Sequence, residues 1–245
     1  MSDKLDKLKK WIGASKKTVF FGGAGVSTES GIPDFRSKDG LYNRRDVRFD
    51  AYRPEYLLSS DCLENEPEVF FEFYRQKLDT RSCSPNPAHL TLARLERENR
   101  LSSVITQNID SLHQRAGSRR VIELHGSTAR NYCSACGRVF GPDAIFNSAE
   151  PVPRCSCGGM IRPDVTLYGE QLPERAVEEA LEEISSADLL IIGGTSLTVY
   201  PAASFVGYFS GAHRVVINRD PLDIPLDPDN DLEINEPIGA FMSGL

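Results

Sequence analysis

Residues 18–28 read Thr-Val-Phe-Phe-Gly-Gly-Ala-Gly-Val-Ser-Thr, and this stretch decides the fold class. Its first four residues, Thr18–Phe21, are β-branched or aromatic and predict a short buried strand. The glycines at 22, 23 and 25 end that strand abruptly and predict a tight turn. A second segment of the same character, Leu189–Ile192 followed by Gly193-Gly194-Thr195-Ser196, lies far along the chain. Strands that end in glycine-rich turns are typical of α/β proteins.

Helical and strand patterns alternate along most of the chain. Amphipathic helices are predicted for residues 3–14, 66–79, 87–100, 109–116, 173–185 and from about residue 201, and further strands for residues 101–106, 121–124 and 214–218. Nearly continuous apolar strands that alternate with helices form parallel sheets covered on both faces. We therefore expect an α/β fold with a parallel sheet and helices on both faces. Residues 36–60 lack a period and are predicted to form a long surface loop.

Composition and charge limit the classes of function. Of the 245 residues, 40% are hydrophobic and 26% are charged, which is typical of a globular protein. No apolar run approaches the roughly 20 residues of a membrane-spanning helix. The N-terminus lacks the apolar stretch of a secretory signal, so we expect a cytoplasmic protein without a membrane partner. A net charge of −7 disfavours direct nucleic-acid binding and suits a basic partner such as a lysine-bearing tail.

Four cysteines lie at metal-ligand spacing in residues 131–162, where the periodic patterns stop. They form the pairs Cys133-x-x-Cys136 and Cys155-x-Cys157, with 18 residues between the pairs. Four thiolates complete a tetrahedral zinc shell and leave no position for a catalytic water, so one structural zinc ion is predicted. A redox disulfide and a nucleic-acid zinc ribbon are the alternatives. The second is disfavoured because residues 128–163 carry only four arginines against two acidic residues.

Polar or small residues follow several predicted strands, and we expect them to meet in one crevice at the carboxyl ends of the sheet. These residues are Gly23, Thr106–Asp110, His125 and Gly194–Ser196. The glycines allow the backbone to approach a diphosphate, although a purely structural turn is the alternative. His125 can accept a proton from a sugar hydroxyl near neutral pH, although a merely packed or surface histidine is the alternative. No functional role is assigned to the other three histidines or to Cys62 and Cys83.

Several motifs together resemble those of the sirtuin family of NAD-dependent protein deacylases. They occur in family order and span essentially the whole chain: Gly23–Arg36, Thr106–His113, His125-Gly126, the four cysteines, Arg162–Val165, Gly194–Leu197 and Ile217-Asn218. The resemblance implies a Rossmann-like NAD-binding domain formed by residues 1–35, 84–130 and 163–245. It further implies a cofactor loop and a helical segment at residues 36–83, and a zinc module at residues 131–162.

The resemblance also implies roles for individual residues. His125 would be the general base, and Asn108 would orient the reacting ribose. Val165 and Tyr168 would contact the acyl-lysine peptide. NAD would be bound by Gly23, Ala24, Gly25, Ser27, Thr28, Asp34, Phe35, Arg36, Gln107, Ile109, Asp110, Gly194, Thr195, Ser196 and Asn218.

The implied reaction is the removal of acetyl or another neutral acyl group from protein lysines. Its products are nicotinamide, free lysine and O-acyl-ADP-ribose. A lysine desuccinylase or demalonylase, a mono-ADP-ribosyltransferase and an inactive NAD-sensing scaffold are the alternatives. Family members that remove succinyl or malonyl groups carry Tyr-x-x-Arg, but this chain has Tyr74 and Lys77. Lysine lacks the bidentate fork that suits a carboxylate, so a neutral acyl group is expected. Tyr168 stands where phenylalanine is commoner in the family.

Overall fold

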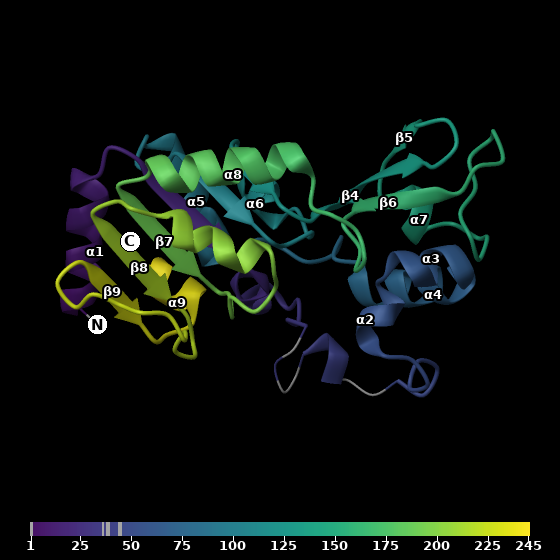
Figure 1. Cartoon of the computed structure of the whole chain (residues 1–245), viewed down its shortest axis with the longest axis horizontal. Coiled ribbons are helices and arrows are strands. Elements are labelled where there is room, and N and C mark those ends of the chain that lie inside the picture. The colour runs from purple at the N-terminus through teal and green to yellow at the C-terminus, as the bar shows by residue number, and fades with distance from the viewer. Residues whose placement is uncertain (1, 36, 38–39, 44–45) are drawn as a thin grey trace.

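The computed structural model describes residues 2–35, 37, 40–43 and 46–245. Its larger sheet has six strands in the order β3-β2-β1-β7-β8-β9 (Figure 1). Their bounds are β1 Thr18–Gly22, β2 Ser103–Thr106, β3 Val121–Glu123, β7 Leu189–Gly193, β8 His213–Ile217 and β9 Asp231–Ile234. All neighbouring strands pair in parallel. The expected parallel α/β sheet is thus confirmed.

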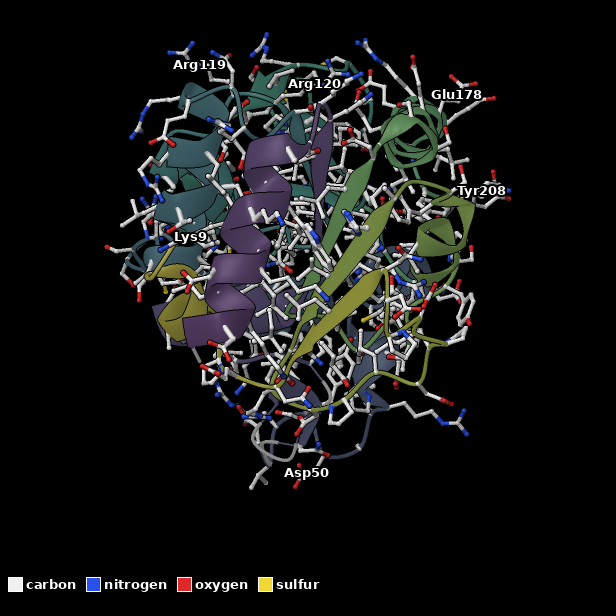
Figure 2. The ribbon with its side chains drawn as sticks, turned by 90° about the vertical axis from the view of Figure 1, so that its left-hand side faces the viewer. Lys9, Asp50, Arg119, Arg120, Glu178 and Tyr208 are labelled. Atoms are coloured by element: carbon white, nitrogen blue, oxygen red, sulfur yellow. The ribbon has the colours of Figure 1, made fainter. Side chains whose placement is uncertain are left out.

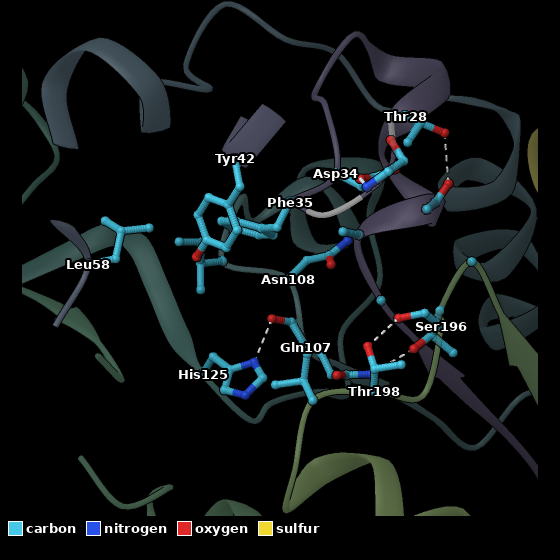
Figure 3. A pocket seen from close by; sticks show the side chains of 18 of the residues that line it. Thr28, Asp34, Phe35, Tyr42, Leu58, Gln107, Asn108, His125, Ser196 and Thr198 are labelled. Atoms are coloured by element: carbon cyan, nitrogen blue, oxygen red, sulfur yellow. Dashed lines mark hydrogen bonds between the residues drawn. The ribbon is translucent and has the colours of Figure 1, made fainter. Parts of the chain in front are cut away.

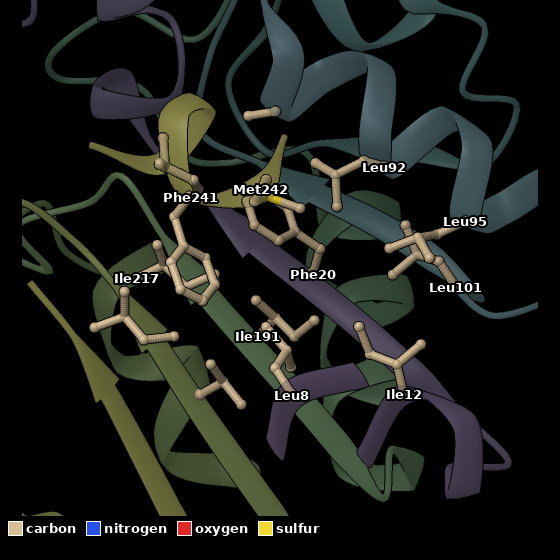
Figure 4. Packing of buried hydrophobic residues seen from close by; sticks show 14 of the residues in the cluster. Leu8, Ile12, Phe20, Leu92, Leu95, Leu101, Ile191, Ile217, Phe241 and Met242 are labelled. Atoms are coloured by element: carbon tan, nitrogen blue, oxygen red, sulfur yellow. The ribbon is translucent and has the colours of Figure 1, made fainter. Parts of the chain in front are cut away.

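Successive side chains of β1 pack on opposite faces of this sheet. Phe20 joins one buried cluster with Leu8 and Leu92, and Phe21 joins another with Ile184 (Figure 4 shows the first cluster). The first face is covered by α1 (Ser2–Ala14), α5 (Pro87–Arg97) and α9 (Ile238–Met242). The second face is covered by α8 (Glu174–Ser186) and the 3-10 helix η4 (Ala202–Tyr208) (Figure 2). Helices therefore cover both faces, as expected.

A smaller body lies beside the large sheet (Figure 1). It contains an antiparallel sheet in the order β5-β4-β6 and a group of short helices. The bounds are α2 Pro54–Leu57, α3 Ser60–Asn65, α4 Pro67–Leu78, β4 Gly126–Cys133, β5 Val139–Phe140, α7 Asp143–Phe146 and β6 Ile161–Val165. Phe70 of α4, Ile145 of α7 and Ile161 of β6 belong to one buried cluster. The helical segment and the cysteine-bearing sheet thus share a core, although the domain division given above stays a prediction.

The expectation of a long surface loop at residues 36–60 is wrong in its described part. Leu41, Phe49, Leu57 and Leu58 are buried in the core of the smaller body. The segment includes α2 and a 3-10 helix, η3, at Leu41–Asn43. Apolar residues at irregular spacing give no periodic signal, yet a folded loop can bury them against α4.

The sequence patterns also missed β9 and α9 near the C-terminus. β9 is an edge strand in which buried residues alternate with half-buried ones, so it lacks the continuous apolar run of the central strands. The helix expected after residue 201 is the 3-10 helix η4. Among the described helices, none combines the length and the apolar character needed to cross a membrane.

Candidate active site

A cavity of about 790 Å³ opens at the carboxyl ends of β1, β2 and β7 and reaches the smaller body. Most of the residues predicted from the sequence line it: Gly23, Ala24, Gly25, Thr28, Asp34, Phe35, Gln107, Asn108, Ile109, His125, Val165, Tyr168, Gly194, Thr195, Ser196 and Asn218. Ser27 and Asp110 are buried beside the cavity and do not line it. Arg36 lies outside the described residues. The volume falls within the range of ligand-binding pockets.

His125 lies between the end of β3 and the start of β4. Its Nδ1 is 2.8 Å from the backbone oxygen of Gln107 (Figure 3). A carbonyl oxygen only accepts hydrogen bonds, so Nδ1 carries the proton and Nε2 is the accepting nitrogen of the neutral ring. Burial lowers the pKa of His125, against a smaller opposing effect of the bond to Gln107. The ring is therefore neutral at pH 7 and able to accept a proton through Nε2.

A buried carboxylate positions the amide of Asn108. The Ser27 hydroxyl donates to Asp110 Oδ2 at 2.6 Å and accepts from Asn108 Nδ2 at 3.1 Å. The amide of Leu112, the first residue of α6 (Leu112–Ala116), donates to Asp110 Oδ1 at 2.8 Å. Burial raises the pKa of Asp110, and the bonds from Ser27 and Leu112 oppose that rise. Ser27 and Asp110 thus act on the cavity through Asn108, which lines it.

The glycine-rich turns after β1 and β7 contact each other. Gly25 N donates to Gly194 O at 2.8 Å, and a Cβ at Gly25 would lie 2.8 Å from Gly194 Cα. Gly194 has a φ of +55°, and its own Cβ would lie 2.3 Å from Val26 N. Both positions therefore require glycine because the two turns approach closely. Close packing of the two turns is thus enough to explain the glycines at 25 and 194. Both residues nevertheless line the cavity.

The turn after β1 continues into two 3-10 helices, η1 (Ala24–Val26) and η2 (Thr28–Ser30), and not into an α-helix. The diphosphate site that free amides form at the start of an α-helix is therefore only partly present in this turn. The amides of Gly25 and Val26 already donate to protein oxygens.

Hydroxyl and amide groups line the side of the cavity next to β7 and β8. Gln107 Nε2 donates to Thr195 Oγ1 at 3.2 Å, and the hydroxyls of Ser196 and Thr198 are 2.8 Å apart (Figure 3). Asn218 directly follows β8 and lies at the same edge of the sheet. These groups can hydrogen-bond sugar hydroxyls or a purine.

The opposite end of the cavity is largely apolar. It is lined by Leu58, Leu78 of α4, and Val165 and Leu167 at the end of β6. Tyr74 also lines it; this side chain is fully buried, and its hydroxyl has no hydrogen-bond partner among the described residues. Burial raises the pKa of the Tyr74 phenol far above its usual range.

Lys77, one turn of α4 after Tyr74, does not line the cavity. Its Nζ is 2.9 Å from Asp46 Oδ2. Several further residues line the cavity although no sequence motif predicts them: Tyr42, Leu58, Val199, Tyr200, Arg219 and Asp220. Apart from Tyr42 of η3 they lie outside the helices and strands, and none belongs to a recognisable local motif.

The Sγ atoms of Cys133, Cys136, Cys155 and Cys157 all lie within 4.8 Å of one another. The separations are 3.5 Å between Cys133 and Cys157 and 3.8 Å between Cys136 and Cys155. A zinc ion about 2.3 Å from each sulfur separates ligand sulfurs by about 3.8 Å, whereas a disulfide is about 2.05 Å long. A Cβ at Gly159 would lie 2.6 Å from Cys133 Sγ, so glycine is required beside the cluster. The four residues fit one structural zinc ion.

Comparison with known proteins gives one consistent family. The model of the Sir2 family matches residues 23–201. A curated NAD-dependent protein deacetylase of Cutibacterium acnes is 53% identical over 98% of this chain and 96% of its own length. The NAD-dependent protein deacetylase of Clostridium acetobutylicum is 48% identical over 98% of this chain and 97% of its own length. A solved complex of Sir2 with a p53 peptide and NAD+ superposes with a TM-score of 0.83 at 36% identity over 97% of this chain and 95% of that one. A Sir2 structure bound to acetylated peptide superposes with a TM-score of 0.84 at 34% identity, over 97% of this chain and 95% of that one.

Proposed function

This chain belongs to the Sir2 family, and from that membership we infer that it is an NAD-dependent protein deacetylase with one structural zinc ion. Full-length similarity to curated deacetylases supports the activity. Within this chain's own site, the observation that supports the activity most directly is the hydrogen bond from His125 Nδ1 to Gln107 O. It leaves Nε2 of a neutral imidazole as a proton acceptor in the cavity.

NAD supplies a ribose carbon that becomes electrophilic as nicotinamide leaves, and the acetyl oxygen of the substrate lysine is the nucleophile. His125 accepts a proton from a ribose hydroxyl through Nε2. The amide of Asn108, held by Ser27 and Asp110, orients the same ribose. With one water molecule consumed, the deprotonated hydroxyl would bond to the acetyl carbon as the bond from that carbon to the lysine nitrogen breaks. The products would be free lysine, nicotinamide and O-acetyl-ADP-ribose.

The remaining roles follow the position of each residue around the cavity. Thr195, Ser196 and Asn218, next to β7 and β8, bind the adenosine half of NAD. Gly23, Ala24, Gly25, Thr28 and Gly194, in the contacting turns, flank the diphosphate. Gln107 and Ile109 contact the nicotinamide riboside, and Asp34 and Phe35 line the cavity beside it. For Arg36, a role in NAD binding is proposed from the family resemblance alone. Val165 and Tyr168 contact the peptide at the end of β6.

The acyl group is acetyl or another small neutral group. Leu58, Leu78 and Leu167 give the end of the cavity an apolar lining. Lys77, which stands where a carboxylate-binding arginine occurs in desuccinylases, is paired with Asp46 outside the cavity. These contacts favour a deacetylase over a desuccinylase or demalonylase.

The partners are acetylated lysines of proteins. We further propose that the protein acts in the cytoplasm, which is supported by six cysteines without a disulfide among them. Direct nucleic-acid binding is not part of the proposal, because the net charge of −7 repels a phosphate backbone.

The experiment that tests the function is nicotinamide release by the purified protein with NAD and an acetyl-lysine peptide. We expect one nicotinamide for each lysine deacetylated, and little release with the unacetylated peptide. Transfer of ADP-ribose to protein without deacetylation would identify a mono-ADP-ribosyltransferase instead. NAD binding without any turnover would identify an NAD-sensing scaffold.

A further inference from the structure

The segment that carries Tyr168 is held firmly to the smaller body. The amide of Tyr168 donates to Leu58 O, and its carbonyl accepts from Ser60 N, each at 3.0 Å. Two residues further on, Glu170 forms an ion pair with Arg162 at 2.8 Å and accepts from Leu167 N at 2.8 Å. Tyr168 is therefore a fixed point on the wall of the cavity.

The hydroxyl of Tyr168 accepts a hydrogen bond from the hydroxyl of Tyr42 at 3.1 Å. Tyr42 belongs to η3, so this bond joins two walls of the cavity that are far apart in the sequence. Both rings line the cavity. A phenylalanine at position 168, which is commoner in the family, has no hydroxyl and cannot make this bond.

Tyr42 in turn holds Phe35. The amide of Tyr42 donates to Phe35 O at 3.0 Å, and the amide of Leu41 donates to Asp34 O at 2.7 Å. The rings of Phe35 and Tyr42 pack with their centroids 5.4 Å apart. Figure 3 shows this pair of rings on the side of the pocket opposite His125. The position of Phe35 therefore depends on where Tyr42 is anchored.

We propose that the Tyr42–Tyr168 hydroxyl pair is a positioning element that fixes Asp34 and Phe35 in the arrangement that binds NAD. Neither hydroxyl takes part in the chemistry. The pair contributes by holding Asp34 and Phe35 in place before the ligand arrives, which reduces the ordering cost of binding. This inference rests on the proposed function for the identity of the ligand.

The test is calorimetric titration of NAD into the full-length protein and its Tyr168→Phe, Tyr42→Phe and double variants, together with steady-state deacetylation. Loss of one hydrogen bond predicts that Tyr168→Phe weakens NAD binding by about three- to tenfold. KM for NAD should rise by the same factor while kcat changes by less than about twofold. Because the two hydroxyls bond to each other, Tyr42→Phe should have a smaller effect in the Tyr168→Phe background than in the wild type.

Tyr52→Phe is the matched control. It removes a phenol hydroxyl that donates to Glu66 Oε2 at 2.7 Å in the same smaller body, but Tyr52 does not line the cavity. Its NAD affinity should equal that of the wild type. An unchanged affinity in Tyr168→Phe, or independent effects of the two substitutions, would overturn the proposal. Because titration needs no turnover, an inactive wild type that binds NAD would refute the deacetylase function alone and leave this comparison valid.

Discussion

The ammonium of Lys77 lies 2.9 Å from Asp46 Oδ2. Lys77 is one helical turn from Tyr74, which lines the cavity, but this ion pair holds the Lys77 ammonium outside the cavity. Arg48 also donates to Asp46, and hydrogen bonds from Arg48 and Lys77 hold the pKa of that carboxyl well below its usual range. Asp46 therefore stays ionised at every pH at which the protein would be assayed. Within the part of the chain that the structure describes, the apolar end of the cavity is therefore left without a lysine that could pair with the carboxylate of a succinyl group.

This arrangement predicts acyl preference. We expect kcat/KM for an acetyl-lysine peptide to exceed that for the matching succinyl-lysine peptide by at least about tenfold, because a buried carboxylate would lack a charged partner among the described residues at this end of the cavity. Lys77→Ala should leave acetyl turnover within about twofold of the wild type. Comparable rates for both peptides, with the succinyl rate lost in Lys77→Ala, would show that Lys77 reaches the acyl group.

The four-cysteine cluster predicts dependence of the smaller body on zinc. Cys133→Ser removes one of four ligands, so the purified protein should contain well below one zinc per chain and should aggregate or lose the structure around β4 and β6. Elemental analysis and circular dichroism measure the two effects. Cys83→Ser, which changes a cysteine outside the cluster, is the control and should retain one zinc. A well-folded Cys133→Ser protein with stoichiometric zinc would refute the ligand role.

Two buried histidines predict a loss of stability in mild acid. His89 of α5 and His113 of α6 lie with their rings 4.7 Å apart, and burial lowers their pKa values to about 4 and about 3. The unfolded chain binds protons at these histidines near pH 6.5, which the folded chain does not. Stability should therefore fall as pH drops below about 6.5, by about 1.4 kcal/mol per pH unit for each histidine.

Urea unfolding between pH 5 and 7 measures this slope, in a range where carboxylates contribute little. In His113→Leu, the slope of the unfolding free energy against pH should be smaller by the equivalent of about one bound proton, whatever the absolute stability of that variant. An unchanged slope would mean that His113 does not stay neutral in the folded protein.

The lowered pKa of His125 predicts how kcat/KM changes with pH on the acid side. A general base works only when it is deprotonated, so kcat/KM should fall on the acid side as His125 becomes protonated. Because burial lowers the pKa of His125, the midpoint should lie below the ordinary value of 6.5. Rates measured from pH 5 to 8 locate it. A midpoint above 7 would contradict a buried neutral imidazole.

Much of the fold and the site could be predicted from local patterns. Thr18–Gly22 and Leu189–Gly193 are central strands buried on both faces, so their apolar runs are continuous and easy to recognise. The four cysteines were found because metal ligands need short spacings within two turns. His125 and Asn108 were found because each follows a strand of the parallel sheet.

Other features depend on contacts that no local pattern records. Asp231–Ile234 escaped detection because an edge strand alternates buried and half-buried residues after an acidic, proline-containing segment. Leu58 and Tyr42 line the cavity but come from a segment whose sequence has no periodicity. The burial of Asp110 behind Asn108, and the pairing of Lys77 with Asp46, are tertiary contacts that only the folded chain brings together.

The most direct test of the central claim is single-turnover deacetylation by His125→Ala, followed alongside its zinc content and its affinity for NAD. With zinc and affinity retained, we expect the rate of deacetylation to fall by at least about a hundredfold, the usual scale for the loss of a general base. A folded His125→Ala enzyme that deacetylates at nearly the wild-type rate would contradict the role assigned to Nε2 and the mechanism built on it.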